Sequence, residues 1–249
     1  MAYNLYNGLP QFSYTLYSLM SILLITIPIL TMKSMAEERH SRTDQLLLTS
    51  PVTLTGVVLG KYFAMVTVFL IPVALMAFCP LIIAMNGEAR LLSDYAALFA
   101  FFLMGCVFLA IGMFLSSLTE SQIISAVSTF AVLLILYLCD DLTGFLPSAL
   151  GDLLSAFSFT QTFYNFVQYS MFDLGGVVLY LSLAGLFVFL TIQGLQKRRW
   201  SYREVEKMKN KAKISHSLRQ GGYLAGVTAG VLAVVVLVNP VSYTHLTLP

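Results

Sequence analysis

Few residues of this 249-residue chain have a type and spacing that could support catalysis. Its three histidines, His40, His216 and His245, lie outside the long apolar stretches, and none forms an H-E-x-x-H zinc pair. The segment 56–62 is one residue shorter than a phosphate-binding loop, and Tyr62 stands where a Ser or Thr would hold magnesium. We therefore expect no catalytic residue, no metal site and no bound cofactor in this chain.

Two adjacent carboxylates, Asp140 and Asp141, follow an apolar stretch and could attract a cation. A calcium site takes about six to eight oxygen ligands, so two carboxylates fall far short of one. Thr143 and Gly144 come next and are typical of residues that end a helix. We favour a polar helix end at this position, with cation contact as the alternative.

The overall composition indicates what kind of protein carries these residues. Hydrophobic residues make up 58% of the chain and charged residues only 10%, whereas a soluble domain carries about 25% charged residues. This excludes a water-soluble enzyme and a disordered chain. The net charge of +2 gives no general attraction to nucleic acid, so the bilayer itself is the expected surrounding.

Long charge-poor stretches predict membrane-spanning helices. About 20 residues of helix cross the roughly 30 Å hydrocarbon core, and barrel strands would alternate in polarity, which these stretches do not. The predicted fold class is an all-α polytopic membrane protein, a bundle of about six transmembrane helices. The expected spans are 12–32, 62–85, 95–117, 121–139, 174–196 and 222–238.

One further apolar stretch, 153–172, makes a poor span. It contains Gln161, Asn165 and Gln168 among many aromatic residues. Such a composition suits an outer re-entrant or interfacial helix.

Lys and Arg predict the topology, because positive charge is retained on the cytoplasmic side of short loops. With 33–61 inside and one crossing per span, Arg90 alone lies outside. A crossing at 153–172 would destroy this partition, so we reject it, and the N-terminus is expected outside. The inside set holds 13 of the 14 basic residues: Lys33, Arg39, Arg42, Lys61, Lys197, Arg198, Arg199, Arg203, Lys207, Lys209, Lys211, Lys213 and Arg219.

Four consecutive residues after 174–196, namely Lys197, Arg198, Arg199 and Trp200, are of types that anchor a helix end at the membrane interface. A basic cytoplasmic linker follows at 201–221, and topology explains its charge without nucleic acid. In 222–238 glycines recur every four residues from Gly222. This spacing allows close helix packing, either at a dimer contact or within the bundle.

The most distinctive polar segment is 32–52, which is predicted to be helical between two spans. Glu38 and Arg42 have the favourable i,i+4 order, Leu46, Leu47 and Leu48 supply an apolar end, and Ser50-Pro51 breaks the helix. Physical reasoning alone favours a solvated connection whose charges fix topology. A contact surface for a cytosolic partner is the alternative.

Residues 35–52 read M-A-E-E-R-H-S-R-T-D-Q-L-L-L-T-S-P-V, which resembles the A-E-E-R…L-L-L-[ST]-x-P segment of type-2 ABC exporter permeases. Gln45 stands where that family commonly has an acid. Gly60-Lys61-Tyr62 is similar to the start of the family's next span, and 115–126 resembles its short cytoplasmic turn. The resemblance covers roughly residues 10–200 and is closest to the gliding-motility-type branch.

The resemblance implies a permease subunit without ATPase activity, in a bacterial cytoplasmic membrane. Two permease halves, identical or different, would pair with two cytosolic ATP-binding subunits that bind ATP and magnesium. The segment 36–48 would be the coupling helix seated on that ATPase. A non-transporting scaffold that recruits the same partner is the alternative function. The positions matching the contact are Glu37, Glu38, Arg39, Thr43, Leu46, Leu47 and Leu48.

The same resemblance divides the chain. Residues 1–200 are the expected permease-like domain, without the family's first span, and 201–221 form the linker. The helix at 222–238 would open a second module, since an auxiliary extracytoplasmic protein is sometimes fused or added there. Residues 239–249 fit neither module and are expected to be a tail.

Overall fold

The computed structural model describes residues 12–41, 43, 53–86, 91–143, 162–163 and 174–208. These ranges are helical and contain no strand, which confirms the all-α prediction for the described part of the chain. The helices are α2 (Phe12–Thr31), α3 (Ala36–His40), α5 (Leu54–Met76), α6 (Phe78–Asn86), α7 (Leu91–Leu118), α8 (Gln122–Thr143) and α11 (Leu174–Met208).

Four segments of the described chain are long and apolar enough to cross a membrane. A fifth apolar helix, Gln122–Leu138, is shorter. The predicted span 222–238 lies outside the described residues, as do the tail and residues 209–221 of the linker, whose first eight residues, 201–208, belong to α11. The four candidate spans are Ser18–His40, Leu54–Met85, Leu91–Leu118 and Leu174–Arg199.

One predicted span begins in the wrong place, because a charged residue was taken as its boundary. Helix α5 begins at Leu54 rather than at residue 62, so Lys61 lies inside the helix. The candidate span in α11 ends at Arg199, close to the predicted residue 196, and the helix itself continues to Met208. Lys and Arg are good helix formers, and their long side chains carry the charge away from the apolar surface.

Of the stretch 153–172, only Thr162 and Phe163 are described, and both are buried. The Phe163 ring centroid lies 6.4 Å from that of Phe101 in α7. The predicted interfacial position of the rest of this stretch lies outside the described residues.

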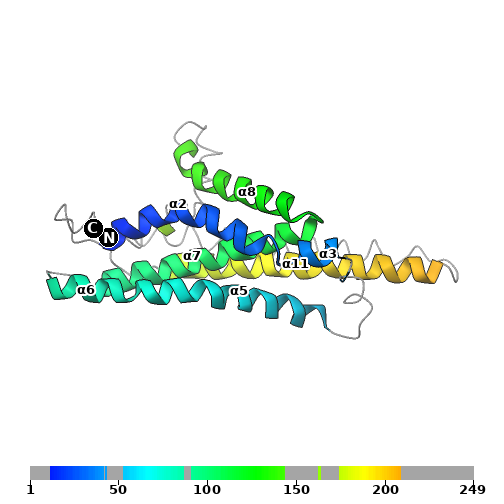
Figure 1. Cartoon of the computed structure of the whole chain (residues 1–249), viewed down its shortest axis with the longest axis horizontal. Helices are drawn as coiled ribbons and strands as arrows, with labels where there is room; N and C mark the ends of the chain where they lie inside the picture. The colour runs from blue at the N-terminus through cyan, green and yellow to red at the C-terminus, as the bar shows by residue number, and fades with distance from the viewer. Residues whose placement is uncertain are drawn as a thin grey trace.

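Helix α7 is the centre of the bundle. It packs against α2, α5, α6, α8 and α11, which surround it in Figure 1. Of its apolar window 72% is buried, against 22% for the window in Leu54–Met85. Helix α7 therefore forms the core, whereas α5 keeps a broad apolar face on the outside.

Two glycines let neighbouring helices approach α7 closely. A Cβ built on Gly112 would lie 2.8 Å from Cβ of Thr31 in α2, and one on Gly105 would collide with the Phe69 ring of α5. Neither side chain could yield without moving its helix or its ring. A small residue at position 112 is thus required for the observed packing, and a larger one at position 105 would displace the Phe69 ring.

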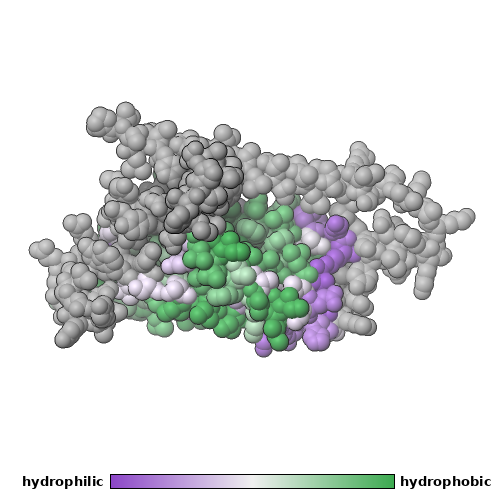
Figure 2. Space-filling view, turned by 90° about the horizontal axis from the view of Figure 1, so that it is seen from above, coloured by the Kyte–Doolittle hydropathy of each residue, from purple (hydrophilic) through white to green (hydrophobic). Residues whose placement is uncertain are grey.

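Several helix ends lie close together at one end of the bundle. Figure 1 shows that α3, the start of α5, the end of α7 and the start of α8 lie near one end, where α11 runs past them. We call this the α3 end. Figure 2 shows hydrophilic residues gathered there and apolar residues over the adjoining middle of the visible face.

The arrangement brings together the six basic residues whose side chains are described. They all belong to the set predicted on one side of the membrane, and their grouping fits that prediction. The side of the cell that this end faces remains a prediction. These residues are Lys33, Arg39, Lys61, Lys197, Arg198 and Arg199.

Candidate functional site

A serine from α7 holds the N-terminus of α3. The backbone N–H groups of Met35 and Ala36 each donate to Ser116 Oγ over 3.1 Å, and that hydroxyl donates to the Met32 carbonyl at 3.3 Å. Met35 occupies the N-cap position and supplies no capping side chain of its own. Because the first N–H groups of a helix lack partners within it, fully buried Ser116 provides the missing cap from another helix.

The carbonyl of the next residue, Ser117, joins three helices. Arg39 of α3 donates to it through Nη1 at 3.3 Å, and Arg198 of α11 donates to it through Nη2. Arg39 also pairs through Nη2 with Glu120 Oε1 at 3.1 Å. Hydrogen bonds from charged donors are stronger than neutral ones, so this carbonyl fixes α3 and α11 to the end of α7.

Lys61 ties α5 to the same place. Its Nζ donates to the Ser34 carbonyl at 2.8 Å and lies 2.5 Å from Oε1 of Glu38. Both side chains of the ion pair are partly buried, with 25% and 33% of their areas exposed. The apolar stem of Lys61 stays within α5 while its charge reaches the turn before α3 and the helix itself.

The other face of α3 is open. Glu37, His40 and Ser41 are exposed, as is Thr43 beyond them. The Ser41 hydroxyl donates to the Glu37 carbonyl at 2.8 Å, and the Thr43 hydroxyl donates to the Glu38 carbonyl at 3.2 Å. These bonds satisfy the last carbonyls of α3 and present a polar surface outward.

The residues predicted to contact a partner therefore fall into an outward-facing group and a group bound within the bundle. Glu37 and Thr43 face outward, whereas Glu38 and Arg39 are engaged with Lys61 and with the end of α7. The described helix covers only Ala36–His40 of the predicted helix 36–48, and Leu46, Leu47 and Leu48 lie outside the described residues. Contact between any of these positions and a partner stays a prediction.

The predicted interface anchors also differ from one another. Lys197 is exposed, Arg199 is partly buried, and Arg198 donates to Ser117. Trp200 lies within α11, but its side chain is outside the described residues. Anchoring in lipid remains a prediction for this group.

Sequence reasoning assigned no role to Ser116, Ser117 or Glu120, although all three lie in the segment 115–126 that was compared with a family turn. The available signal was a pair of serines at the end of a long apolar helix. Residues 56–62, which resemble a shortened phosphate-binding loop, lie within α5 and form no loop.

The described residues give little support for a metal site. They contain no group of three or more His, Cys, Asp or Glu residues placed to hold a metal ion. Asp140 and Asp141 lie near the end of α8, and their side chains are outside the described part.

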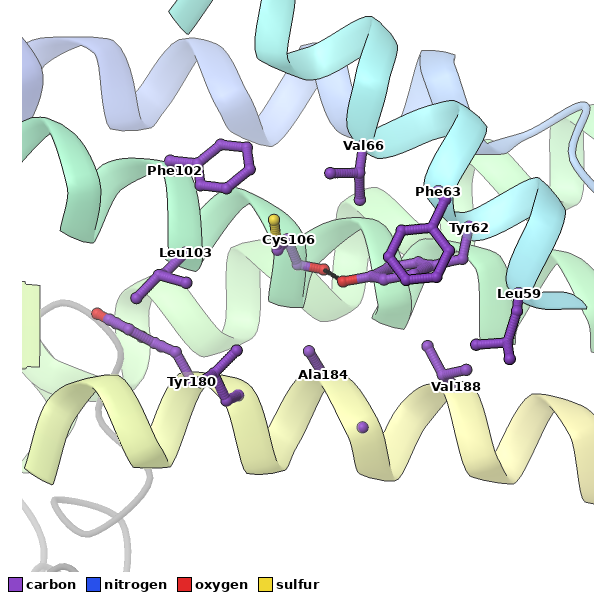
Figure 3. Close-up of a pocket in the computed structure, with 12 residues that line it drawn as sticks. Leu59, Tyr62, Phe63, Val66, Phe102, Leu103, Cys106, Tyr180, Ala184 and Val188 are labelled. Carbon is purple, nitrogen blue, oxygen red and sulfur yellow. Dashed lines mark hydrogen bonds between the residues drawn. The ribbon is translucent and has the colours of Figure 1, made fainter.

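An apolar groove of about 430 Å³ lies between α5, α7 and α11 (Figure 3). The Tyr62 hydroxyl, the polar group of its α5 wall, donates to the Cys106 carbonyl at 3.0 Å. The groove thus offers an almost wholly apolar surface. Its lining is formed by Leu59, Tyr62, Phe63, Val66, Phe102, Leu103, Cys106, Tyr180, Leu181, Ala184, Gly185 and Val188.

Comparison with protein families matches residues 2–192 to the ABC-2 family transporter proteins. Neither the curated proteins nor the solved structures compared with this chain give a match. The family match covers well over half of the 249 residues and includes α2 to α8 and most of α11. This chain therefore belongs to the ABC-2 family of membrane transporter proteins.

Proposed function

We propose that this chain is the permease subunit of an ABC exporter, and that the α3 end couples its helices to a separate ATP-binding subunit. Family membership supports the permease role. The resemblance of residues 35–52 favours the gliding-motility-type branch and export.

The observation that carries the proposal is the two-sided attachment of α3. Its exposed side offers Glu37 and His40, while its buried side is bound to α5 by Lys61 and to α7 by Ser116. A force applied to α3 would therefore pass directly into the central helix. A partner that binds more tightly in one of two bundle states would shift the population between them.

The wider assembly follows from the same proposal. Two permease halves would stand over two ATP-binding subunits, which hold ATP and magnesium, so this chain needs no cofactor. An auxiliary extracytoplasmic subunit could join them. The α3 end would face the cytosol of a bacterium, with the segment before α2 outside.

The sharpest test uses Glu37, because it is exposed and its charge reversal leaves the buried contacts of α3 intact. The chain is co-expressed with the ATP-binding protein encoded beside it, and Glu37→Lys is compared with Glu37→Gln. We expect Glu37→Lys to weaken the complex about tenfold, through repulsion at a charged rim, and to reduce permease-stimulated ATP hydrolysis.

Thermal unfolding of the permease alone serves as the control and should not change. Unaltered assembly together with unaltered stimulated hydrolysis would contradict the proposed contact. Substrate flux into reconstituted vesicles decides the remaining question. Assembly without flux for any substrate tested would support the scaffold function instead.

A second experiment tests the topology. Reporter fusions at Arg90 and Lys209 should report opposite sides of the membrane, with Lys209 in the cytosol. The six described cations at one end of the bundle support this expectation. Both reporters on one side would contradict it.

A further inference from the structure

Two arginines from different helices share one acceptor at the end of α7. The Ser117 carbonyl accepts a hydrogen bond from Arg39 Nη1 of α3 at 3.3 Å and another from Arg198 Nη2 of α11 at 2.5 Å. Because α7 ends at Leu118, this carbonyl is one of the last four of the helix, which have no partner within it. A carbonyl oxygen has two lone pairs, so it can serve both arginines at once.

The two guanidinium groups repel each other across this oxygen. Their bonding nitrogens lie at most about 6 Å apart, a separation at which like charges on a protein interact appreciably. Arg39 has a carboxylate partner in Glu120, but the side chain of Glu120 is 77% exposed, so water screens its attraction. The two arginines therefore compete for the carbonyl: when one withdraws, the other binds it more closely.

Helix α11 leads from this contact to the apolar groove. Residues of α11 from Tyr180 to Val188 contribute to the groove wall in Figure 3, and Val188 lies ten residues, about 15 Å of helix, before Arg198. Over its 35 residues α11 contains no proline, whereas α2 and α5 contain Pro28 and Pro72. Since proline is a principal cause of helix kinks, a displacement of α11 at Arg198 would reach the groove wall.

We propose that Arg198 is a positioning residue, which passes movement of α3 to α11 through the shared Ser117 carbonyl. When a partner draws α3 away from the end of α7, Arg39 releases the carbonyl and Arg198 moves closer to it. When α3 is pressed back, Arg198 is displaced, and α11 shifts with it. Lys61 attaches α5, another wall of the groove, to the same α3 end. This inference rests on the proposed function, because the ATP-binding subunit is the partner that moves α3.

Lys197 provides a matched control. It precedes Arg198 in the same helix, carries the same charge and is exposed. Arg198→Gln and Lys197→Gln each remove one cation from this end of α11, but Arg198→Gln also removes a charged donor to the Ser117 carbonyl. Arg198→Lys keeps both the charge and a donor, so it should restore what Arg198→Gln loses.

The full chain is co-expressed with the ATP-binding protein encoded beside it, and amide hydrogen exchange is compared with ADP and with a non-hydrolysable ATP analogue. In the unmodified chain we expect the analogue to change exchange in the peptides of α3 and of α11 together. Arg198→Gln should keep the α3 response and reduce the α11 response about tenfold, the factor that corresponds to one hydrogen bond from a charged donor. Lys197→Gln should keep both responses, which a general loss of positive charge would not allow.

A second measurement needs no partner. Arg39→Gln, Arg198→Gln and the double variant are compared in denaturant. Either single change relieves the repulsion and leaves the carbonyl a donor, whereas the double change removes both donors. The double variant should therefore raise the unfolding constant about threefold more than the two single effects multiplied.

A full α11 response in Arg198→Gln, or an equal loss in Lys197→Gln, would overturn the inference, as would a double variant no worse than the product of the single ones. Should Arg198→Gln fail to fold, the unmodified chain decides: a response of α3 without one of α11 refutes the inference, and a joint response supports it. Absence of any α3 response in the unmodified chain would contradict the proposed function itself, and the inference with it, so the two failures are distinguishable.

Discussion

The apolar middle of the bundle and its α3 end are held together by different forces. In the middle, α2 and α5 approach α7 through Gly112 and Gly105, and shape alone fixes the distance. At the α3 end, hydrogen bonds and an ion pair from α5 and α7 hold a five-residue helix, and α11 is bound to the same Ser117 carbonyl. A closely packed contact allows only one distance between two helices, whereas a hydrogen bond or ion pair can be replaced by one to another partner. The middle is suited to remain rigid while the α3 end responds to a partner.

The largest effect is expected in the middle, from Gly112→Leu. The new side chain must displace Thr31, which is fully buried, so α2 and α7 would have to separate. Overpacking typically costs about 1–3 kcal/mol, and a backbone shift raises that cost, so we expect little folded protein.

The measurement is the unfolding temperature of the detergent-purified chain, with Gly60→Leu as the matched control. Gly60 lies in α5 with no atom near an added Cβ, so that change should be almost neutral. Equal unfolding temperatures for the two variants would contradict the close approach of α2 to α7.

The next largest effect is expected from Ser116→Ala at the α3 end. The change leaves the buried N–H groups of Met35 and Ala36 without an acceptor, at a cost of about 1–3 kcal/mol. Ser117→Ala is the control, because that hydroxyl bonds only its own helix at Phe114, and the Ser117 carbonyl remains. Amide exchange should accelerate at Met35 and Ala36 in Ser116→Ala alone. Acceleration in both variants, or in neither, would show that Ser116 is not the cap.

The contrast between these two regions also separates what the sequence could predict from what it could not. The apolar stretch 95–117 falls inside α7, because a span is recognised from the composition of consecutive residues. The start of α5 was misplaced because a charge does not end a helix when its side chain can reach a polar partner, as Lys61 reaches Glu38.

The contacts that hold α3 against α7 could not be predicted from the sequence, for a different reason. Ser116 lies about eighty residues from Met35 and Ala36, and only the packing of α7 brings them together. Glu37 and Glu38 were both predicted to be contact residues. A helix of five residues is too short for a hydrophobic periodicity that would reveal which of them faces inward.

A smaller effect is expected at the ion pair between Lys61 and Glu38. Both partners are partly exposed, so a cycle of Lys61→Gln, Glu38→Gln and the double variant should give a coupling energy of about 0.5–1 kcal/mol. Lys61→Gln should be the more harmful single change, since it also removes the bond to the Ser34 carbonyl. Unfolding in denaturant measures all three. A coupling energy of zero would indicate that hydrogen bonds, rather than charge, hold α5 to α3.

The smallest effect is expected from Glu120→Gln. The side chain of Glu120 is 77% exposed, so water and salt screen its attraction to Arg39, and exposed pairs contribute about 0–1 kcal/mol. Arg39 also keeps its bond to the Ser117 carbonyl, which the substitution does not touch. Arg39→Gln removes both contacts and should destabilise the chain more than Glu120→Gln in the same unfolding measurement. If the two changes were equally costly, the exposed ion pair would be the main attachment of Arg39, and the α3 end would loosen sharply in molar salt. A larger loss for Arg39→Gln instead places the attachment at the Ser117 carbonyl, where salt should have little influence.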